Sequence, residues 1–161
     1  MPDALVDADR FKDVLGAVAA PVAVVTSLDD AGPHGTTVSA FCSLSLAPPM
    51  VLVSLDGDST LLARVRRSGR FAINVLAQRQ AALATRFARK GADKFADVAW
   101  HDESGLPRLP DARGFIACRV ERHVPAGDHV LVLGLVEQAE RSDASPLLYC
   151  ERRFGSFGEA A

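Results

Sequence analysis

Hydrophobic and polar positions follow two different periods along the chain, which predicts a mixed fold with more strand than helix. Apolar residues three and four apart mark three helices. These cover residues 9–19, 59–68 and 78–90. Pro21 stops the first helix, while Ser59 is a typical N-cap and Gly69 a typical end of the second. Short apolar or alternating runs predict up to seven strands, at 22–28, 35–40, 50–56, 71–76, 115–124, 130–136 and 147–150.

The order of these elements predicts one α+β domain that is mainly β. Six or seven strands with two or three helices favour a closed or partly closed antiparallel barrel as the core. Residues 91–113 are rich in turn formers and lack a clear period. This segment is either a flap over a pocket or a surface loop.

Composition supports a single globular domain and lowers the expectation of a nucleic-acid role. The chain has 161 residues, of which 48% are hydrophobic and 24% are charged. That length suits one domain with a core of its own. The formal net charge of −2 leaves no basic excess to neutralise a phosphate backbone.

The first residues do not show the positive start and apolar core of a secretory signal. Residues 35–55 carry no charge and are long enough to span a bilayer, but they contain hydroxyl residues and the pair Pro48-Pro49. We therefore expect two soluble strands joined by a turn, and no membrane association. Cys42, Cys118 and Cys150 form no CxxC pair, so we expect buried free thiols in a reducing cytoplasm.

Motifs for several common reactions are missing from the sequence. It contains no GxGxxG, no GxxxxGK[ST], no HExxH and no GxSxG. The four histidines do not have the spacing of metal ligands, so we expect no metal site.

The stretch GTTVSAFCSLSLAPP at residues 35–49 is the most informative candidate for binding. Its five Ser and Thr hydroxyls and its main-chain N–H groups suit a flat ligand with polar edges, and they add no net charge. A solvated edge strand is the alternative, because Thr also favours strands.

Three further features each allow a binding role and a plain structural one. Ser59 and Thr60, after Asp58, open a helix that either binds a phosphate or is merely capped. His129 begins a strand at the mouth of the barrel, where it either contacts a ligand or is held by its own turn. Arg152 and Arg153 suit an anionic ligand or a surface ion pair equally well.

Taken in order, these segments resemble the short flavin reductases, which are the reductase partners of two-component flavin-dependent monooxygenases. The similarity covers about residues 11–157 of a single domain, 1–161. It is carried by GTTVSAFCSLSLAPPMVLVSL (35–55), SGRFAINVL (68–76), DKFADV (93–98), GDHVLVLGLV (127–136) and PLLYCERRFG (146–155).

The resemblance implies an FMN-binding split β-barrel, antiparallel and Greek-key-like, with peripheral helices. It also implies an enzyme, usually a homodimer, that passes a hydride from NADH or NADPH to FMN or FAD. The reduced flavin would then leave or be handed to a monooxygenase. Hydride transfer needs no nucleophile, because the flavin supplies the reactive centre.

The same resemblance implies a role for each matching residue. The isoalloxazine would lie along Thr37, Val38 and Ser39, and its dimethylbenzene-to-ribityl side would meet Ser43, Leu44 and Ser45. The ribityl chain and phosphate would reach Ser54, Ser59 and Thr60, with Lys94 and Phe95 closing over the cofactor. His129 and Arg152 would border the nicotinamide. Asp58 departs from the family, which often has a neutral or basic residue there, and it puts the phosphate contact in doubt.

Two other functions are consistent with the same residues. One is a flavin-binding protein without reductase activity, such as an electron carrier or flavin store. The other is a purely structural dimerisation barrel in which the hydroxyl-rich strand faces water.

Overall fold

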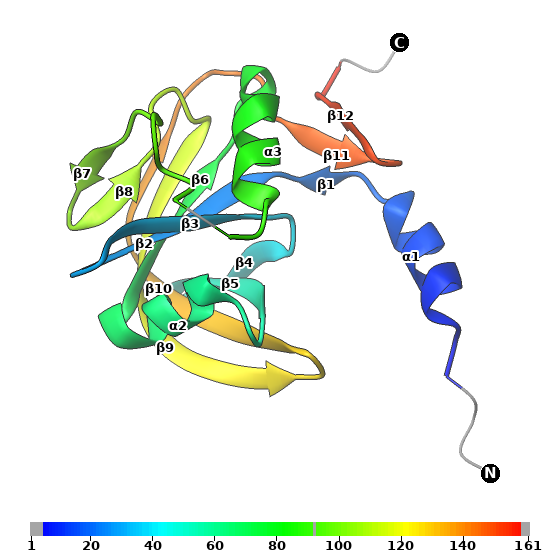
Figure 1. Cartoon of the computed structure of the whole chain (residues 1–161), viewed down its shortest axis with the longest axis horizontal. Coiled ribbons are helices and arrows are strands. Elements are labelled where there is room, and N and C mark those ends of the chain that lie inside the picture. Colours follow the sequence, from blue (N-terminus) through cyan, green and yellow to red (C-terminus); the bar gives the residue numbers. More distant parts are fainter. Residues whose placement is uncertain (1–4, 92, 159–161) are drawn as a thin grey trace.

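One seven-stranded antiparallel sheet forms the body of the protein in the computed structural model, which describes residues 5–91 and 93–158 (Figure 1). The strands lie in the order β3–β2–β6–β9–β10–β5–β4. Their bounds are β2 (Ala23–Asp29), β3 (Gly32–Val38), β4 (Phe41–Leu46), β5 (Pro49–Asp56), β6 (Arg70–Val75), β9 (Gly114–Ala126) and β10 (His129–Arg141).

The sheet curls into a barrel that stays open between its two edge strands, β3 and β4. Among the described residues these two strands share no ladder. The link between them is made by Ala40, whose carbonyl accepts a hydrogen bond from the Ser54 N–H on β5 at 2.9 Å. The expected antiparallel split barrel is therefore confirmed.

Helix α2 (Thr60–Ser68) packs against the barrel as its sequence predicts. The Ser59 hydroxyl oxygen accepts the Leu62 N–H at 3.0 Å, and Gly69 ends the helix with a φ of +67°. The face formed by Leu61, Leu62 and Val65 is fully buried. These side chains join the main core, which includes Val25, Val53, Phe71, Ile73 and Val132.

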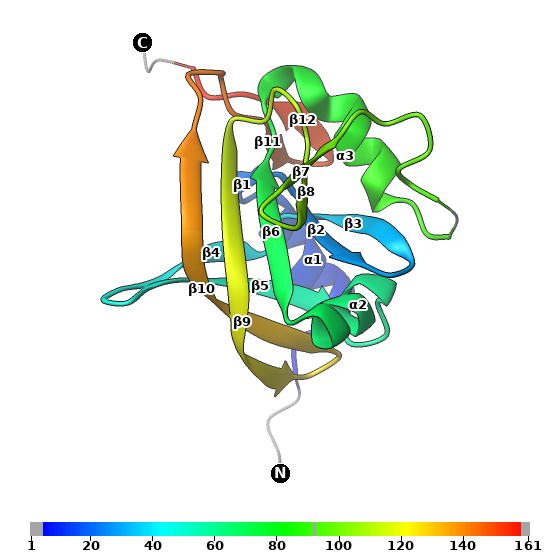
Figure 2. The same ribbon diagram turned by 90° about the vertical axis from the view of Figure 1, so that its left-hand side faces the viewer.

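A second, smaller core lies outside the barrel beneath helix α3 (Ala81–Ala88), which follows the short 3-10 helix η1 (Gln78–Gln80). The Phe87 and Phe95 rings meet edge to face, with centroids 4.9 Å apart. The hairpin of β7 (His101–Glu103) and β8 (Leu106–Arg108) covers the neighbouring part of the sheet, at β2 and β6 (Figure 2).

The buried Asn74 side chain fixes this covering segment to β6. Its Oδ1 accepts the Leu109 N–H at 2.8 Å, and its Nδ2 donates to the Pro107 carbonyl at 3.2 Å. The surface-loop alternative for residues 91–113 is therefore wrong, because Phe95, Leu106 and Leu109 are buried against α3 and the sheet. The flap alternative stays a prediction.

Several elements differ from the predicted ones. Strand β4 was predicted as a turn region, yet it pairs with β5 across a bulge between Ser43 and Ser45. The hydrogen bonds between β4 and β5 stabilise this strand, although many of its residues are small and polar. A separate small sheet joins β1 (Ala20–Pro21), β11 (Leu148–Cys150) and the unpredicted β12 (Arg153–Gly155).

The expectation of buried thiols holds for one cysteine only. Cys118 is buried, and burial raises the pKa of its thiol to about 12. Cys42 is exposed because it lies on the edge strand β4, and Cys150 is partly exposed. All three are free, as expected.

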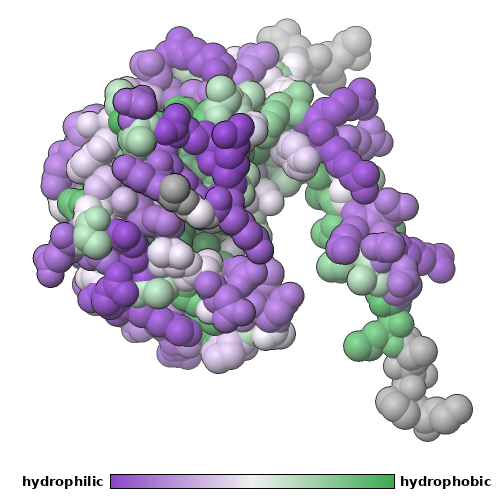
Figure 3. Space-filling model, in the orientation of Figure 1, coloured by the Kyte–Doolittle hydropathy of each residue, from purple (hydrophilic) through white to green (hydrophobic). Residues whose placement is uncertain are grey.

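The first helix, α1 (Ala8–Gly16), stands away from the body as an arm (Figures 1 and 3). None of its residues is buried, and it ends at Gly16, three residues before the predicted end at residue 19. Hydrophobic side chains line the side of the arm that faces the gap in Figure 3. Phe11 and Val14, for example, are 55% and 62% exposed.

Within residues 5–91 and 93–158, no helix combines the length and hydrophobicity needed to cross a bilayer.

Candidate functional site

A hollow of about 420 Å³ opens at the edge of β3, between the start of α2 and the end of α3. We call it the α2–α3 hollow. Its lining includes His34, Thr36, Asp56, Asp58, Ser59, Thr60, Arg89, Lys90 and Lys94. Two of these are predicted phosphate-end residues, Ser59 and Thr60, and a third is the predicted closing residue Lys94.

The Lys94 ammonium is held in place by the edge strand and by α3. Its Nζ donates to the Thr36 hydroxyl and to the Phe87 carbonyl, each at 2.9 Å. Burial lowers the pKa of this ammonium. Because an ammonium has three donors, one remains for an anionic ligand in the hollow.

The start of α2 presents hydroxyl groups and helix N–H groups to the same hollow. Ser59 uses its hydroxyl oxygen as the N-cap, and Thr60 is exposed. A helix N-terminus favours negative charge, and Arg89, Lys90 and Lys94 add positive charge opposite it. Asp56 and Asp58 also line the hollow and oppose this field. The Asp56 Oδ1 accepts the Asp58 N–H at 2.8 Å, so part of its charge is engaged locally.

His34 forms the wall between this hollow and a second one. Burial, together with the nearby positive charges of Arg64 and Lys94, lowers the pKa of His34 from 6.5 to about 4, and the carboxylates of Asp29 and Asp93 oppose part of this shift. The imidazole is therefore neutral at pH 7, with one N–H available to donate.

The second hollow, of about 660 Å³, continues past His34. We call it the Trp100 hollow; it is lined by Pro33, His34, Thr60, Arg64, Asp93, Phe95 and Trp100, among others. The Arg64 guanidinium is fixed by the Asp29 carboxylate and the Gly32 carbonyl, each at 2.9 Å. Because Arg67 also bonds to Asp29, at 2.7 Å, this three-residue group carries a net positive charge.

The register of β5 and β10 places His129 and Ser54 near Asp56, which marks the rim of the α2–α3 hollow, but neither His129 nor Ser54 is among the lining residues. Ser54 and Asp56 lie on one face of β5, since side chains two apart share a face. His129 pairs directly with Asp56 across the sheet. Its Nδ1 lies 2.8 Å from the Asp128 Oδ1, and this hydrogen bond lowers the pKa of the Asp128 carboxyl.

The three residues predicted to lie along the flavin ring occupy different environments. The Thr37 hydroxyl donates to the Ala84 carbonyl on α3 at 2.6 Å, and the Val38 side chain is buried in the barrel core. Only Ser39 is exposed, at the point where β3 leaves the sheet. A ring at this edge would therefore meet mainly backbone groups of residues 37–39.

Phe95, the second predicted closing residue, lies in the second core. Its side chain is 6% exposed and packs edge to face on Phe87 and on Trp100. Apolar burial draws it there, where it borders the Trp100 hollow, and its closing over the cofactor stays a prediction.

Two predicted groups lie away from this rim within one chain. Ser43 pairs with Val51, which is five residues along β5 from Asp56, or roughly 17 Å. Leu44 and Ser45 share that outer part of β4. Arg152 lies in the exposed turn between β11 and β12, and Figures 1 and 2 place this turn at the opposite end of the molecule from the turn between β9 and β10. His129 is the first residue of β10.

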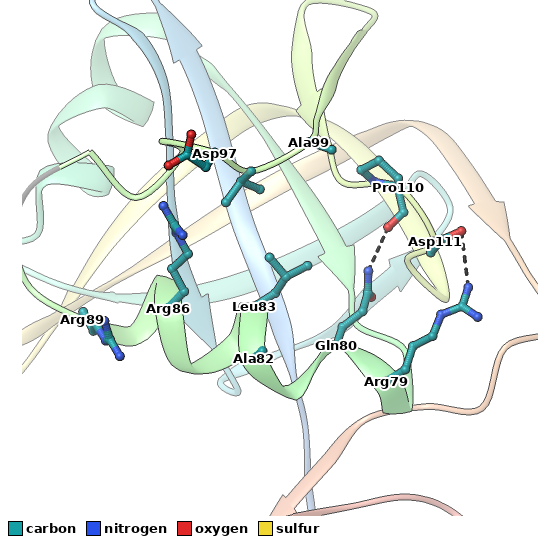
Figure 4. A pocket seen from close by; sticks show the side chains of 11 residues that line it. Arg79, Gln80, Ala82, Leu83, Arg86, Arg89, Asp97, Ala99, Pro110 and Asp111 are labelled. Atoms are coloured by element: carbon teal, nitrogen blue, oxygen red, sulfur yellow. Dashed lines mark hydrogen bonds and ion pairs between the residues drawn. The ribbon is translucent and has the colours of Figure 1, made fainter.

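A third hollow, of about 600 Å³, lies on the outer side of α3 and contains none of the predicted site residues (Figure 4). Several of its polar side chains are engaged in an ion pair or in hydrogen bonds to backbone carbonyls. Gln80 donates to the Pro110 carbonyl at 2.8 Å, and Arg79 lies 3.3 Å from Asp111. Arg86 donates to the carbonyls of Lys94 and Ala96, which anchors the turn that carries Lys94.

Among the residues of the adjoining hollows that sequence reasoning missed are His34, Arg64, Arg89 and Trp100. His34 stands one residue before the hydroxyl-rich stretch, and that proximity is a usable signal. The other three come from α2, α3 and the covering segment, and only folding brings them together.

The residues present fit a phosphorylated flavin. A flat polar-edged ring suits the exposed backbone after β3, while the cations and the start of α2 suit its phosphate. The two carboxylates in the hollow weaken the fit without removing it. Among the described residues no group of histidine, cysteine and acidic side chains is placed to hold a metal ion.

Comparisons with known proteins agree with this fit. The model of the flavin reductase like domain matches residues 15–158. The reductase component of a 4-nitrophenol 4-monooxygenase/4-nitrocatechol 2-monooxygenase of Rhodococcus opacus is 42% identical over 94% of this chain and 82% of its own. A flavin reductase (NADH) of Kitasatospora aureofaciens is 40% identical over 93% and 82%.

A solved structure shows the same architecture. It is the NADH:FAD oxidoreductase SgcE6 of Streptomyces globisporus C-1027, in complex with NAD and FAD fragments. It is 33% identical to this chain, covers 98% of it with 99% of its own length, and has a TM-score of 0.89.

Proposed function

This chain belongs to the flavin reductase-like family, and from that premise we propose that it is an NAD(P)H:flavin oxidoreductase. It passes a hydride from NADH or NADPH to FMN or FAD and supplies the reduced flavin to a partner monooxygenase. The observation that carries the proposal is the α2–α3 hollow, which places Lys94, Ser59 and Thr60 beside the uncharged edge of β3.

The residues of this chain bind and orient the reactants. Backbone groups of residues 37–39 would face the ring edge, while Lys94 and the start of α2 would hold the phosphate. The flavin, when bound, supplies the centre that accepts the hydride. Orientation of the two reactants at roughly 3–3.5 Å is then the main contribution of the protein.

We assign His129 to the nicotinamide side of the site. It stands on the same face of the sheet as Ser54 and Asp56, near the rim of the hollow, and its ring is oriented by Asp128. Arg152 can border the same site only if another chain supplies it, because its own turn lies at the far end of the molecule.

Two further proposals concern assembly and location. The exposed apolar residues of α1 and of the β4–β5 hairpin, including Phe11, Leu15 and Leu46, favour a homodimer in which a second copy covers them. The free cysteines suit a reducing compartment, so we place the protein in the cytoplasm.

A turnover assay tests the activity. Purified protein is mixed with NADH or NADPH and with free FMN or FAD, and the absorbance of reduced nicotinamide is followed. We expect oxidation that depends on added flavin. A flavin retained through gel filtration with negligible turnover would instead identify an electron carrier or flavin store, and neither binding nor turnover would leave a structural barrel.

Variants test the assignment of residues within the site. His129→Ala should slow nicotinamide-dependent reduction more than it weakens flavin binding, and Ser39 or Thr37 substitutions should do the reverse. His101→Ala, on the exposed strand β7, is the matched control. Equal effects of His129→Ala on both quantities would contradict the assignment.

A further inference from the structure

The two adjoining hollows form one continuous path along the edge of β3. They share His34, Thr60 and Gly91 among their lining residues. A phosphate held by Lys94 and the start of α2 would therefore lie at the entrance of the Trp100 hollow. FMN ends at that phosphate, whereas FAD continues through a second phosphate to adenosine.

The Trp100 hollow has the chemistry that an adenosine phosphate requires. Arg64 offers a guanidinium held in a fixed position, and the neutral His34 offers an N–H beside it. Trp100 offers an aromatic surface for a base. The ring is held by its edge-to-face contact with Phe95, at 6.0 Å between centroids.

The charges around this hollow allow a second phosphate. Lys94 lines the α2–α3 hollow and Arg64 the Trp100 hollow, each together with His34, and Asp29 is neutralised by its bonds to Arg64 and Arg67. Asp93 also lines the hollow, but its Oδ1 accepts the Phe95 N–H at 3.0 Å. The field along the path therefore stays favourable for an anion.

The outer α3 hollow is a poorer continuation of the phosphate site. It shares only Arg89 with the α2–α3 hollow, and its Arg79 and Arg86 are engaged with Asp111 and with backbone carbonyls.

We propose that the Trp100 hollow is the subsite for the adenosine monophosphate half of FAD, and that this chain therefore binds FAD in preference to FMN. The inference rests on the proposed function. It assigns Trp100, Arg64 and His34 to the choice between the two flavins, while Lys94, Ser59 and Thr60 serve both.

Paired binding titrations test this preference. The dissociation constants of FAD and FMN are measured by quenching of flavin fluorescence. Wild type should bind FAD about tenfold more tightly than FMN, because stacking of one base on an aromatic ring is of this order. Trp100→Ala should remove most of that difference and leave FMN within about twofold of wild type. Trp100→Phe should retain it, and Arg79→Gln, in the outer α3 hollow, is the control.

A second measurement does not depend on any variant. Adenosine monophosphate should compete with FAD for wild-type protein and leave FMN binding unchanged. If Trp100→Ala weakens the binding of both FAD and FMN through a packing defect, competition by adenosine monophosphate in the wild type still shows whether the adenosine subsite exists. Competition with neither flavin would overturn the inference.

The outcomes separate the inference from the proposed function. Equal affinities for FAD and FMN, with both flavins reduced, would overturn only the adenosine subsite. A rise in the KM of NADH in Trp100→Ala without a change in the FAD:FMN ratio would also overturn it, by assigning the hollow to the nicotinamide cosubstrate. Reduction of neither flavin would refute the proposed function itself.

Discussion

His34 shows how one residue's surroundings control its charge. The imidazole is half-buried between Arg64 and Lys94, and protonation there would add a third positive charge to the same wall. The folded protein therefore resists protonation of His34, whereas the unfolded chain accepts a proton near the ordinary pKa of 6.5.

This difference predicts a pH dependence of stability. As the pH falls from about 6.5 to about 4, the unfolded state binds a proton that the folded state refuses, so the free energy of unfolding decreases. His34→Gln should reduce that decrease, because glutamine does not titrate. Urea unfolding at several pH values measures it, with His101→Gln as the matched variant. Identical slopes for wild type and His34→Gln would contradict the prediction.

Substitution of Lys94 should weaken the binding of FMN and of FAD to the same extent. Lys94→Gln removes an ammonium held by two hydrogen bonds at 2.9 Å beside the start of α2. We expect the dissociation constant of FMN to rise by about tenfold, and its dependence on salt to weaken, because a charge-assisted contact is lost. Lys12→Gln, on the distant arm, should bind as wild type does. An unchanged salt dependence in Lys94→Gln would argue against a phosphate at this position.

The elements differ in how completely local sequence determines them. Helix α2 has its N-cap, its apolar face and its terminal glycine within eleven residues, and the structure reproduces all three. Strand β4 has no such local signal. Its Ser-rich segment becomes a strand because β5 offers a partner edge, and hydrogen bonds to that edge outweigh its weak apolar pattern.

Packing between strands predicts the effect of substituting Gly134. A Cβ atom at Gly134 on β10 would lie 2.6 Å from the Phe71 ring on β6 and 3.0 Å from the Cys118 Cβ on β9. Gly134→Ala should therefore destabilise the barrel by about 1–3 kcal/mol, as overpacking of a core does. Gly16→Ala, where nothing lies within 4 Å, is the control. Equal urea midpoints for Gly134→Ala and wild type would show that the Phe71 ring moves aside without cost.

At the scale of the whole molecule, a compact barrel carries an arm that does not pack on it. The apolar side of α1 is exposed in the single chain, and so are apolar side chains of the β4–β5 hairpin. Because large exposed apolar surfaces mark sites of association, the homodimer is a proposal that this shape supports.

A double substitution on the arm tests the dimer. Phe11→Ser with Leu15→Ser should shift sedimentation equilibrium from dimer to monomer. The barrel should keep its thermal unfolding temperature as a monomer, since both side chains are more than half exposed and belong to neither core. Lys12→Ser with Asp13→Ser, on the same helix, should leave the dimer intact. A dimer that survives the first pair would exclude the arm from the interface.

Sequence alone determined the features that depend on neighbours along the chain. Six of the seven barrel strands, the capped helix α2 and the uncharged edge at residues 35–40 follow from local period and local hydrogen bonding. Tertiary structure decided what depends on distant partners. It drew Phe95 into a core, separated Arg152 from His129, and set His34, Arg64 and Trp100 around one hollow, because burial and strand register act between residues that the sequence keeps apart.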